Sequence, residues 1–126
     1  RIKSLEMESN IASLHYVLDD GGQYQVYIFN RGKGPFADSL IELQVPSFDL
    51  GQVPVSELEK YLLNWNLEHT FGAWAIDNHN NRLTLVAKYW GKMLDKQSFG
   101  AVCSDMVQTV DEFERLINGL RKDGTE

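Results

Sequence analysis

A long stripe of apolar residues near the C-terminus constrains the fold more than any other feature of this chain. Its members recur every three or four residues, the spacing of one face of an α-helix, over about six or seven turns. They are Phe99, Val102, Cys103, Met106, Val107, Val110, Phe113, Leu116, Ile117 and Leu120. Asp95 precedes the stripe and is a suitable N-cap residue. The sequence therefore predicts a long amphipathic helix, which needs an apolar surface to cover.

Three segments in the first half have the patterns of β-strands. Residues 12–18 alternate between apolar and polar, which is typical of a half-buried strand, and the Asp-Asp-Gly-Gly run at 19–22 supplies a turn. Residues 24–29 are apolar on both faces, which favours a central strand, and residues 31–35 break that pattern. Residues 40–45 predict a third strand, which we expect Pro46 to end. The three strands should form a meander.

A second helix and a second hairpin follow. Ser56 and Glu59 have the spacing of a capping box, and an apolar stripe from Leu58 to Trp65 predicts a helix that ends near His69. Residues 71–76 and 83–90 are rich in β-formers, and the loop 77–81 between them contains residues that tolerate left-handed backbone conformations. The order β-β-β-α-β-β-α predicts an α+β fold in which helices cover an antiparallel five-stranded sheet.

The C-terminal helix is longer than such a sheet requires. Six or seven turns span about 36 Å, whereas five strands are about 24 Å across. We therefore expect the last turns, around Phe113, Leu116, Ile117 and Leu120, to close over the middle helix or to contact a second subunit.

Composition and charge narrow the class of partner. A chain of 126 residues is the size of one domain, and 12 basic against 18 acidic residues give a net charge of −6. This charge disfavours nucleic acid and anionic lipid as partners and suits a basic or weakly charged protein surface. No apolar run approaches the ~20 residues that span a bilayer. A single cysteine precludes an internal disulfide and favours the cytoplasm.

The usual signatures of catalysis are missing from the sequence. Cys103 lies on the apolar stripe, where desolvation raises the pKa of a thiol, so we interpret it as structural. His15, His69 and His79 have no metal-ligand spacing. The sequence also lacks a phosphate-binding loop and a nucleophile elbow. We predict a protein that is not an enzyme, with no catalytic residues and no cofactor.

Turn carboxylates leave one alternative open. Asp19, Asp20 and Asp77 occupy turns where oxygen ligands could converge on a hard cation. The loop at 77–81 fails as an EF-hand, because His79 and Arg82 stand at positions that need an oxygen ligand and a glycine. A calcium- or small-ligand-binding regulatory protein is therefore the alternative to a protein-binding one.

Aromatic residues around the middle helix and second hairpin are candidates for partner binding. Tryptophan and tyrosine are enriched at interface hot spots. Trp74 shares a strand face with Ile76, whereas the face that carries Trp90 mixes apolar Val86 with polar Thr84 and Lys88. Trp65, on the apolar stripe of the middle helix, is interpreted as core. The predicted partner-binding set is Trp74, Trp90, Phe113, Leu116, Ile117 and Leu120.

The second half of the chain also resembles a known superfamily. The residues that carry the resemblance are Leu62-Leu63-Asn64-Trp65-Asn66, Phe71-Gly72, and the long helix through Met106-Val107 and Val110-Asp111-Glu112-Phe113. The pattern, which covers about residues 12–120, is similar to that of the YbjN-like and type III secretion chaperone-like superfamily of small, acidic, frequently dimeric bacterial proteins.

This resemblance implies a secretion-chaperone-like sandwich of helices and sheet. It also implies a homodimer that binds a protein or peptide, because the secretion chaperones hold an extended stretch of an effector in apolar surface grooves. Residues 1–10 are too short and too polar to form the superfamily's usual first helix. We therefore expect one domain over residues 1–126 that lacks this helix.

Overall fold

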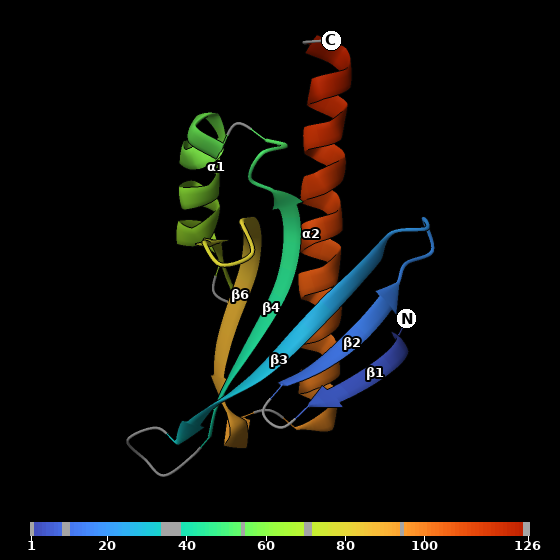
Figure 1. Cartoon of the computed structure of the whole chain (residues 1–126), viewed down its shortest axis with the longest axis vertical. Helices are drawn as coiled ribbons and strands as arrows, with labels where there is room; N and C mark the ends of the chain where they lie inside the picture. Colours follow the sequence, from blue (N-terminus) through green and yellow to red (C-terminus); the bar gives the residue numbers. More distant parts are fainter. Residues whose placement is uncertain are drawn as a thin grey trace.

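The structure, a computed structural model, describes residues 2–8, 11–33, 39–53, 55–69, 72–93 and 95–124. Within these ranges six antiparallel strands form one sheet in the order β1-β2-β3-β4-β6-β5, accompanied by helices α1 and α2 (Figure 1). The elements are β1 (Ile2–Glu8), β2 (Ile11–Val17), β3 (Gln23–Lys33), β4 (Ser39–Asp49), α1 (Val55–Glu68), β5 (Ala73–Asp77), β6 (Arg82–Trp90), the single 3-10 turn η1 (Gly91–Met93) and α2 (Lys96–Gly124). The predicted α+β fold and its order of elements are confirmed, and the sheet gains one further strand.

The additional strand is β1, at the edge of the sheet beside β2. Leu5 pairs with Leu14, and a register irregularity between Ile2 and Ser4 brings Ile2 opposite Tyr16. Ile2 and Leu5, although 51% and 57% exposed, thus lie on the face of the sheet that carries the core. Residues 2–8 do not alternate strictly, so their strand character comes from pairing with β2 and not from a local pattern.

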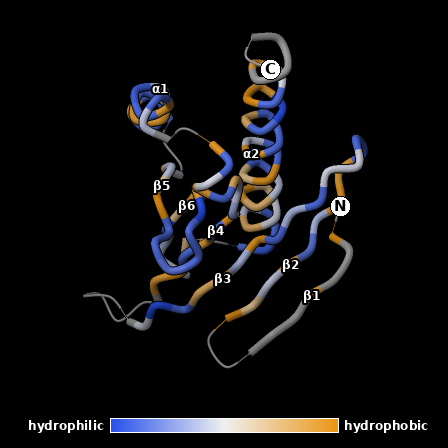
Figure 2. Tube along the Cα trace, turned by 45° about the horizontal axis from the view of Figure 1, so that its top comes forward, coloured by the Kyte–Doolittle hydropathy of each residue, from blue (hydrophilic) through white to orange (hydrophobic). Residues whose placement is uncertain are grey.

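Both helices lie on one face of the sheet. The floor of the core consists of Val26, Leu43, Val45, Leu83 and Leu85, each at most 1% exposed. On α2, hydrophobic and hydrophilic residues gather on different sides of the helix (Figure 2), and its buried side packs on this floor. We call the opposite face of the sheet the open face, because no helix of the described residues covers it. No helix in the described ranges is long and apolar enough to span a membrane.

Two predicted strand ends are wrong. β4 continues through Pro46 to Asp49, and β3 continues through Gly32 to Lys33. Gly32 has φ +89°, a conformation that favours glycine, and the register shifts between Asn30 and Lys33. A local bulge therefore absorbs the irregularity, and the strand resumes beyond it.

β3 and β4 pair over only part of their length. Their ladder ends at the pair Tyr27 and Gln44, after which the two strands diverge (Figure 1). In the described part of the sheet, residues 23–26 pair with β2 alone, and Val45 and Pro46 pair with β6 alone. Pro46 lies where β4 pairs with β6 alone and is an edge on the side of β3, a position where strands tolerate proline.

The predicted turns and the cap of the long helix are confirmed in detail. Gly21 has φ +91°, and the Asp20 carboxylate accepts the backbone N–H of Gly22 at 2.8 Å. Asn81, in the loop of the second hairpin, has φ 57°. Asp95 accepts the backbone N–H of Ser98 at 2.7 Å and thereby caps α2.

The capping box predicted for the middle helix is not at its start. α1 begins at Val55, so Ser56 already lies inside the first turn. The helix ends at Glu68, close to His69 as predicted.

Candidate functional site

A cleft of about 850 Å³ opens where β3 and β4 diverge. Gln23, Gln25 and Tyr27 line it from β3, and Gln44, Pro46 and Ser47 line it from β4. We call it the split cleft. It exists because the sheet divides into two ribbons, one of β1, β2 and β3 and the other of β4, β6 and β5.

At the back of the split cleft, carboxylates of α2 form hydrogen bonds with hydroxyl groups from both ribbons, and these residues form a polar cluster. The Ser47 hydroxyl of β4 donates to Glu114 at 2.7 Å, and the Tyr24 hydroxyl of β3 lies 3.1 Å from the same carboxylate. Tyr24 also donates to Asp111 at 2.9 Å. The pKa of Tyr24 is raised, first by burial and next by its hydrogen bond to Asp111. The neighbouring Glu114 carboxylate also disfavours loss of the hydroxyl proton.

Asp111 is the more deeply buried of the two carboxylates in this cluster, at 6% exposure. Burial, followed by its contact with Asp20, raises the pKa of Asp111, and the pair with Arg115 at 3.1 Å only partly opposes this. Asp20 has the opposite shift: its bond to the Gly22 N–H, followed by its contact with Asp111, lowers its pKa. The two neighbouring carboxyls therefore have pKa values displaced in opposite directions.

The side chains that line the split cleft match the hydrogen-bonding groups of a peptide. Its glutamines, Gln23, Gln25 and Gln44, each both donate and accept, as a peptide bond does. The aromatic rings of Tyr27 and Phe29 supply apolar contacts beside them. The Arg82 guanidinium already donates to the Ser47 carbonyl at 2.7 Å.

Strand edges also face the split cleft. In an antiparallel ladder, alternate residues direct both N–H and C=O toward the same neighbouring strand. Residues 23–26 of β3 and residues 45–49 of β4 have no ladder partner on the side of the cleft, as judged from the pairs between described residues. Backbone groups on these edges therefore lack a strand partner, although Arg82 already binds the Ser47 carbonyl and Pro46 has no N–H.

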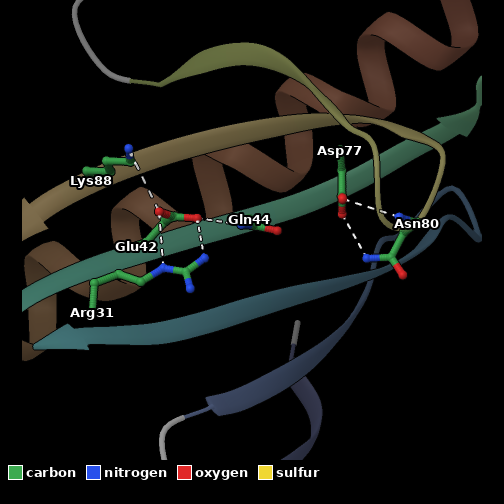
Figure 3. Close-up of polar contacts among 6 residues, drawn as sticks. All are labelled: Arg31, Glu42, Gln44, Asp77, Asn80 and Lys88. Atoms are coloured by element: carbon green, nitrogen blue, oxygen red, sulfur yellow. Dashed lines mark hydrogen bonds and ion pairs between the residues drawn. The ribbon is translucent and has the colours of Figure 1, made fainter.

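The open face beside the cleft carries a buried carboxylate with its partners (Figure 3). Glu42, 8% exposed, accepts two hydrogen bonds from Arg31 at 3.0 and 3.3 Å and one from Gln44, and it lies 3.9 Å from Lys88. Burial on its own would raise the pKa of Glu42, but the bonds from Arg31 and Gln44 outweigh it and hold the pKa below its usual value. Arg31 also lies over the Phe29 ring at 4.4 Å.

A second hollow, of about 540 Å³, lies on the helix-covered face between the end of α1 and the middle of α2. Its lining includes Leu85 and Tyr89 of β6, Met106 of α2, and Trp65, whose ring stacks on His69 at 3.8 Å. Glu68, Asp105 and Glu112 also line it. We call it the helix groove.

Three of the predicted partner-binding residues lie in the interior. Trp74, Phe113 and Ile117 are 7%, 4% and 4% exposed. The Phe113 ring is 4.7 Å from that of Trp74 and 6.0 Å from that of Tyr61 on α1. This part of α2 thus closes over the middle helix, one of the two outcomes predicted for it. Sequence alternation places Trp74 on one face of β5 but cannot show that a helix covers that face.

The other three predicted residues lie at the surface in two places. Leu116 and Leu120, one helical turn apart, are 45% and 59% exposed. Trp90 is half-buried and pairs with Leu40 at the far end of β6. The predicted set is therefore not one continuous surface.

The carboxylates considered for a metal are not brought together. Asp77 accepts bonds from the backbone N–H groups of His79 and Asn80 and from the Asn80 side chain (Figure 3). Asp20 is bound within its own turn and lies 3.8 Å from Arg115. In the described part of the chain no three His, Cys, Asp or Glu residues gather as metal ligands.

Cys103 is fully buried, and burial raises the pKa of its thiol to about 11, as its place on the stripe predicts. The split cleft itself was not predicted. Its only sequence signal is the polar alternation of Gln23 and Gln25 opposite a strand with an internal proline.

Comparison with models of known protein families gives no match. Neither the curated proteins nor the solved structures contain a match. The site is therefore interpreted from its own geometry.

Proposed function

We propose that this chain is a non-enzymatic protein-binding domain that holds an extended polypeptide segment in the split cleft. The observation that carries this proposal is the end of the β3–β4 ladder at Tyr27 and Gln44. Beyond that pair both strands offer backbone groups to a third strand, which is the basis of recognition by β-strand addition.

The cleft also supplies means of selecting its ligand. Four residues of β3, 23–26, face it, which corresponds to about 13 Å of extended chain at about 3.3 Å per residue. The glutamines can bind the backbone of the segment, while Tyr27 and Phe29 contact its apolar side chains. Main-chain hydrogen bonds would provide affinity, and the aromatic contacts would provide selectivity.

The proposal can be tested with peptides selected from a random displayed library on the immobilised protein. Selected peptides should shift the backbone amide NMR signals of residues 23–26 and of residues 45–49, and Tyr27→Ala should weaken binding. Tyr61→Ala is the control, because Tyr61 lies on α1, outside the cleft. Amide shifts confined to other surfaces, or equal effects of the two variants, would contradict the proposal.

We infer further that the chain is a cytoplasmic homodimer related to the YbjN-like and type III secretion chaperone-like superfamily. The order β-β-β-α-β-β-α from Ile11 onward supports the relationship. Exposed Leu116 and Leu120 on α2, whose C-terminal end projects past the sheet in Figure 1, support self-association.

Sedimentation velocity tests the homodimer. The wild type should sediment as a dimer and Leu116→Asp as a monomer, because a charge in an apolar interface is costly to bury. Asn118→Asp, at an exposed neighbouring position of α2, should remain a dimer. A monomeric wild type would refute this part of the proposal.

A further inference from the structure

We infer that the helix groove is a second binding surface, whose occupant is a polypeptide segment that carries apolar side chains flanked by Lys or Arg. The groove is separate from the split cleft, because it lies on the helix-covered face of the sheet and no described residue lines both. The inference therefore does not depend on the proposed function of the cleft.

The groove exists because α1 is short. α1 ends at Glu68, while α2 is 29 residues long and passes it on the same face of the sheet (Figure 1). Between them lies a hollow bordered by the apolar side chains of Val102 and Met106. Apolar side chains of a bound segment can contact these residues and leave water.

Charge complementarity identifies the partner. Glu68, Asp105 and Glu112 line the groove, and none of the described residues that line it is Lys or Arg. No ion pair between described residues includes any of these three carboxylates. Elsewhere the buried carboxylates Glu42 and Asp111 are each paired with arginine. The groove is thus acidic without internal compensation.

The aromatic residues of the groove add a second reason to expect a cation. Tyr89 lines it, as does Trp65, one face of which already stacks on His69, and cations are attracted to the faces of such rings. Lys and Arg can place their aliphatic stems along apolar surface while their charged ends reach carboxylates at its margin. The net charge of −6 attracts a basic partner at long range and repels acidic segments and nucleic acid.

Fluorescence anisotropy with a labelled helical peptide of Leu and Lys tests the inference. The comparison peptide replaces every Lys with Glu. The wild type should bind the Lys peptide and not the Glu peptide, and added salt should weaken binding. Neutralising the groove by Glu68→Gln, Asp105→Asn and Glu112→Gln together should weaken it about tenfold. All three residues are exposed, so the triple variant should fold.

A second triple variant controls for net charge. Asp19→Asn, Glu57→Gln and Glu59→Gln remove the same charge at exposed positions outside the groove, and binding should change little. If both triple variants weakened peptide binding equally, the effect would come from overall charge alone, and the inference would be wrong.

NMR locates the bound peptide. The indole N–H signal of Trp65 should shift on binding, whereas that of Trp74, which does not line the groove, should not. Tyr27→Ala, the variant that tests the split cleft, should leave binding of the Lys peptide unchanged. If Tyr27→Ala abolished it, the peptide would occupy the split cleft and the inference about the groove would be wrong.

Discussion

The side chain of Asn66 binds the backbone of Trp74 as a neighbouring strand would. Its Oδ1 accepts the Trp74 N–H at 2.7 Å, and its Nδ2 donates to the Trp74 carbonyl at 3.2 Å. Helix α1 therefore occupies the outer edge of β5 at this position. A strand could not add to β5 here without displacing Asn66, which contrasts with the edges that face the split cleft.

Asn66→Ala should lower the free energy of unfolding by about 1–3 kcal/mol, because it leaves two backbone groups in a part-buried site without partners. Asn64→Ala is the matched control, since Asn64 bonds the exposed Glu68 side chain and no backbone group. Urea denaturation compares the two variants. Equal losses would mean that the Asn66 bonds to Trp74 contribute nothing specific.

Phe113→Ala should be among the most destabilising substitutions, at about 3–5 kcal/mol, because the ring packs among Phe48, Tyr61 and Trp74. Leu116→Ala, one turn away and 45% exposed, should change the free energy of unfolding of the monomer by about 0.5 kcal/mol. Denaturation at low protein concentration measures both. A similar cost for the two would show that Phe113 is not the anchor between α1 and α2.

Protonation of Asp111 should contribute stability to the protein as the pH falls from neutral. Its pKa is raised in the folded state, mainly by burial, so the folded protein binds this proton more tightly than the unfolded chain. The gain begins as the pH falls through the raised pKa and is complete below the ordinary value of 3.8. Asp111→Asn should remove this gain, measured as Tm against pH.

Asp95 should change stability with pH in the opposite direction and therefore serves as the control. Its carboxylate accepts the Ser98 N–H, which lowers its pKa, so its contribution to stability is present above pH 3.8 and is lost as the pH falls through the lowered pKa. Asp95→Asn should therefore reduce the loss of Tm at low pH. Identical pH profiles for the two variants would contradict both assignments.

Arg31→Met should raise the pKa of Glu42 and lower the free energy of unfolding by about 1–3 kcal/mol, because the buried carboxylate loses two hydrogen bonds. Lys88→Met should have a smaller effect, since Lys88 is 3.9 Å away and its side chain is 61% exposed. NMR titration of Glu42 and urea denaturation supply the measurements. In the double variant with Glu42→Gln, the effect of Arg31→Met should shrink.

The thiol of Cys103 should be inert in the folded protein. It is fully buried with a pKa raised to about 11, so little thiolate forms and none is accessible at mildly alkaline pH. A chromogenic disulfide reagent should react only after denaturant is added. Rapid reaction in native buffer would show that α2 opens readily from the sheet.

The sequence alone predicted the strands and helices from β2 to α2 and their order, but not the edge strand β1. The stripe on α2, the Asp95 cap, the turn at Gly21 and the loop at Asn81 follow from periodicity and local backbone preferences, which are properties of adjacent residues. These features are local, so they were predictable without knowledge of the partner elements.

Tertiary structure alone decided which surfaces meet. Periodicity assigned Trp74 and Phe113 to apolar faces, but their burial depends on where α1 and α2 cross the sheet. The length of β4 beyond Pro46 and the divergence from β3 depend on how the two ribbons twist apart around α2. Both candidate binding surfaces arise from such long-range placement, because a cleft belongs to the space between elements that are distant in sequence.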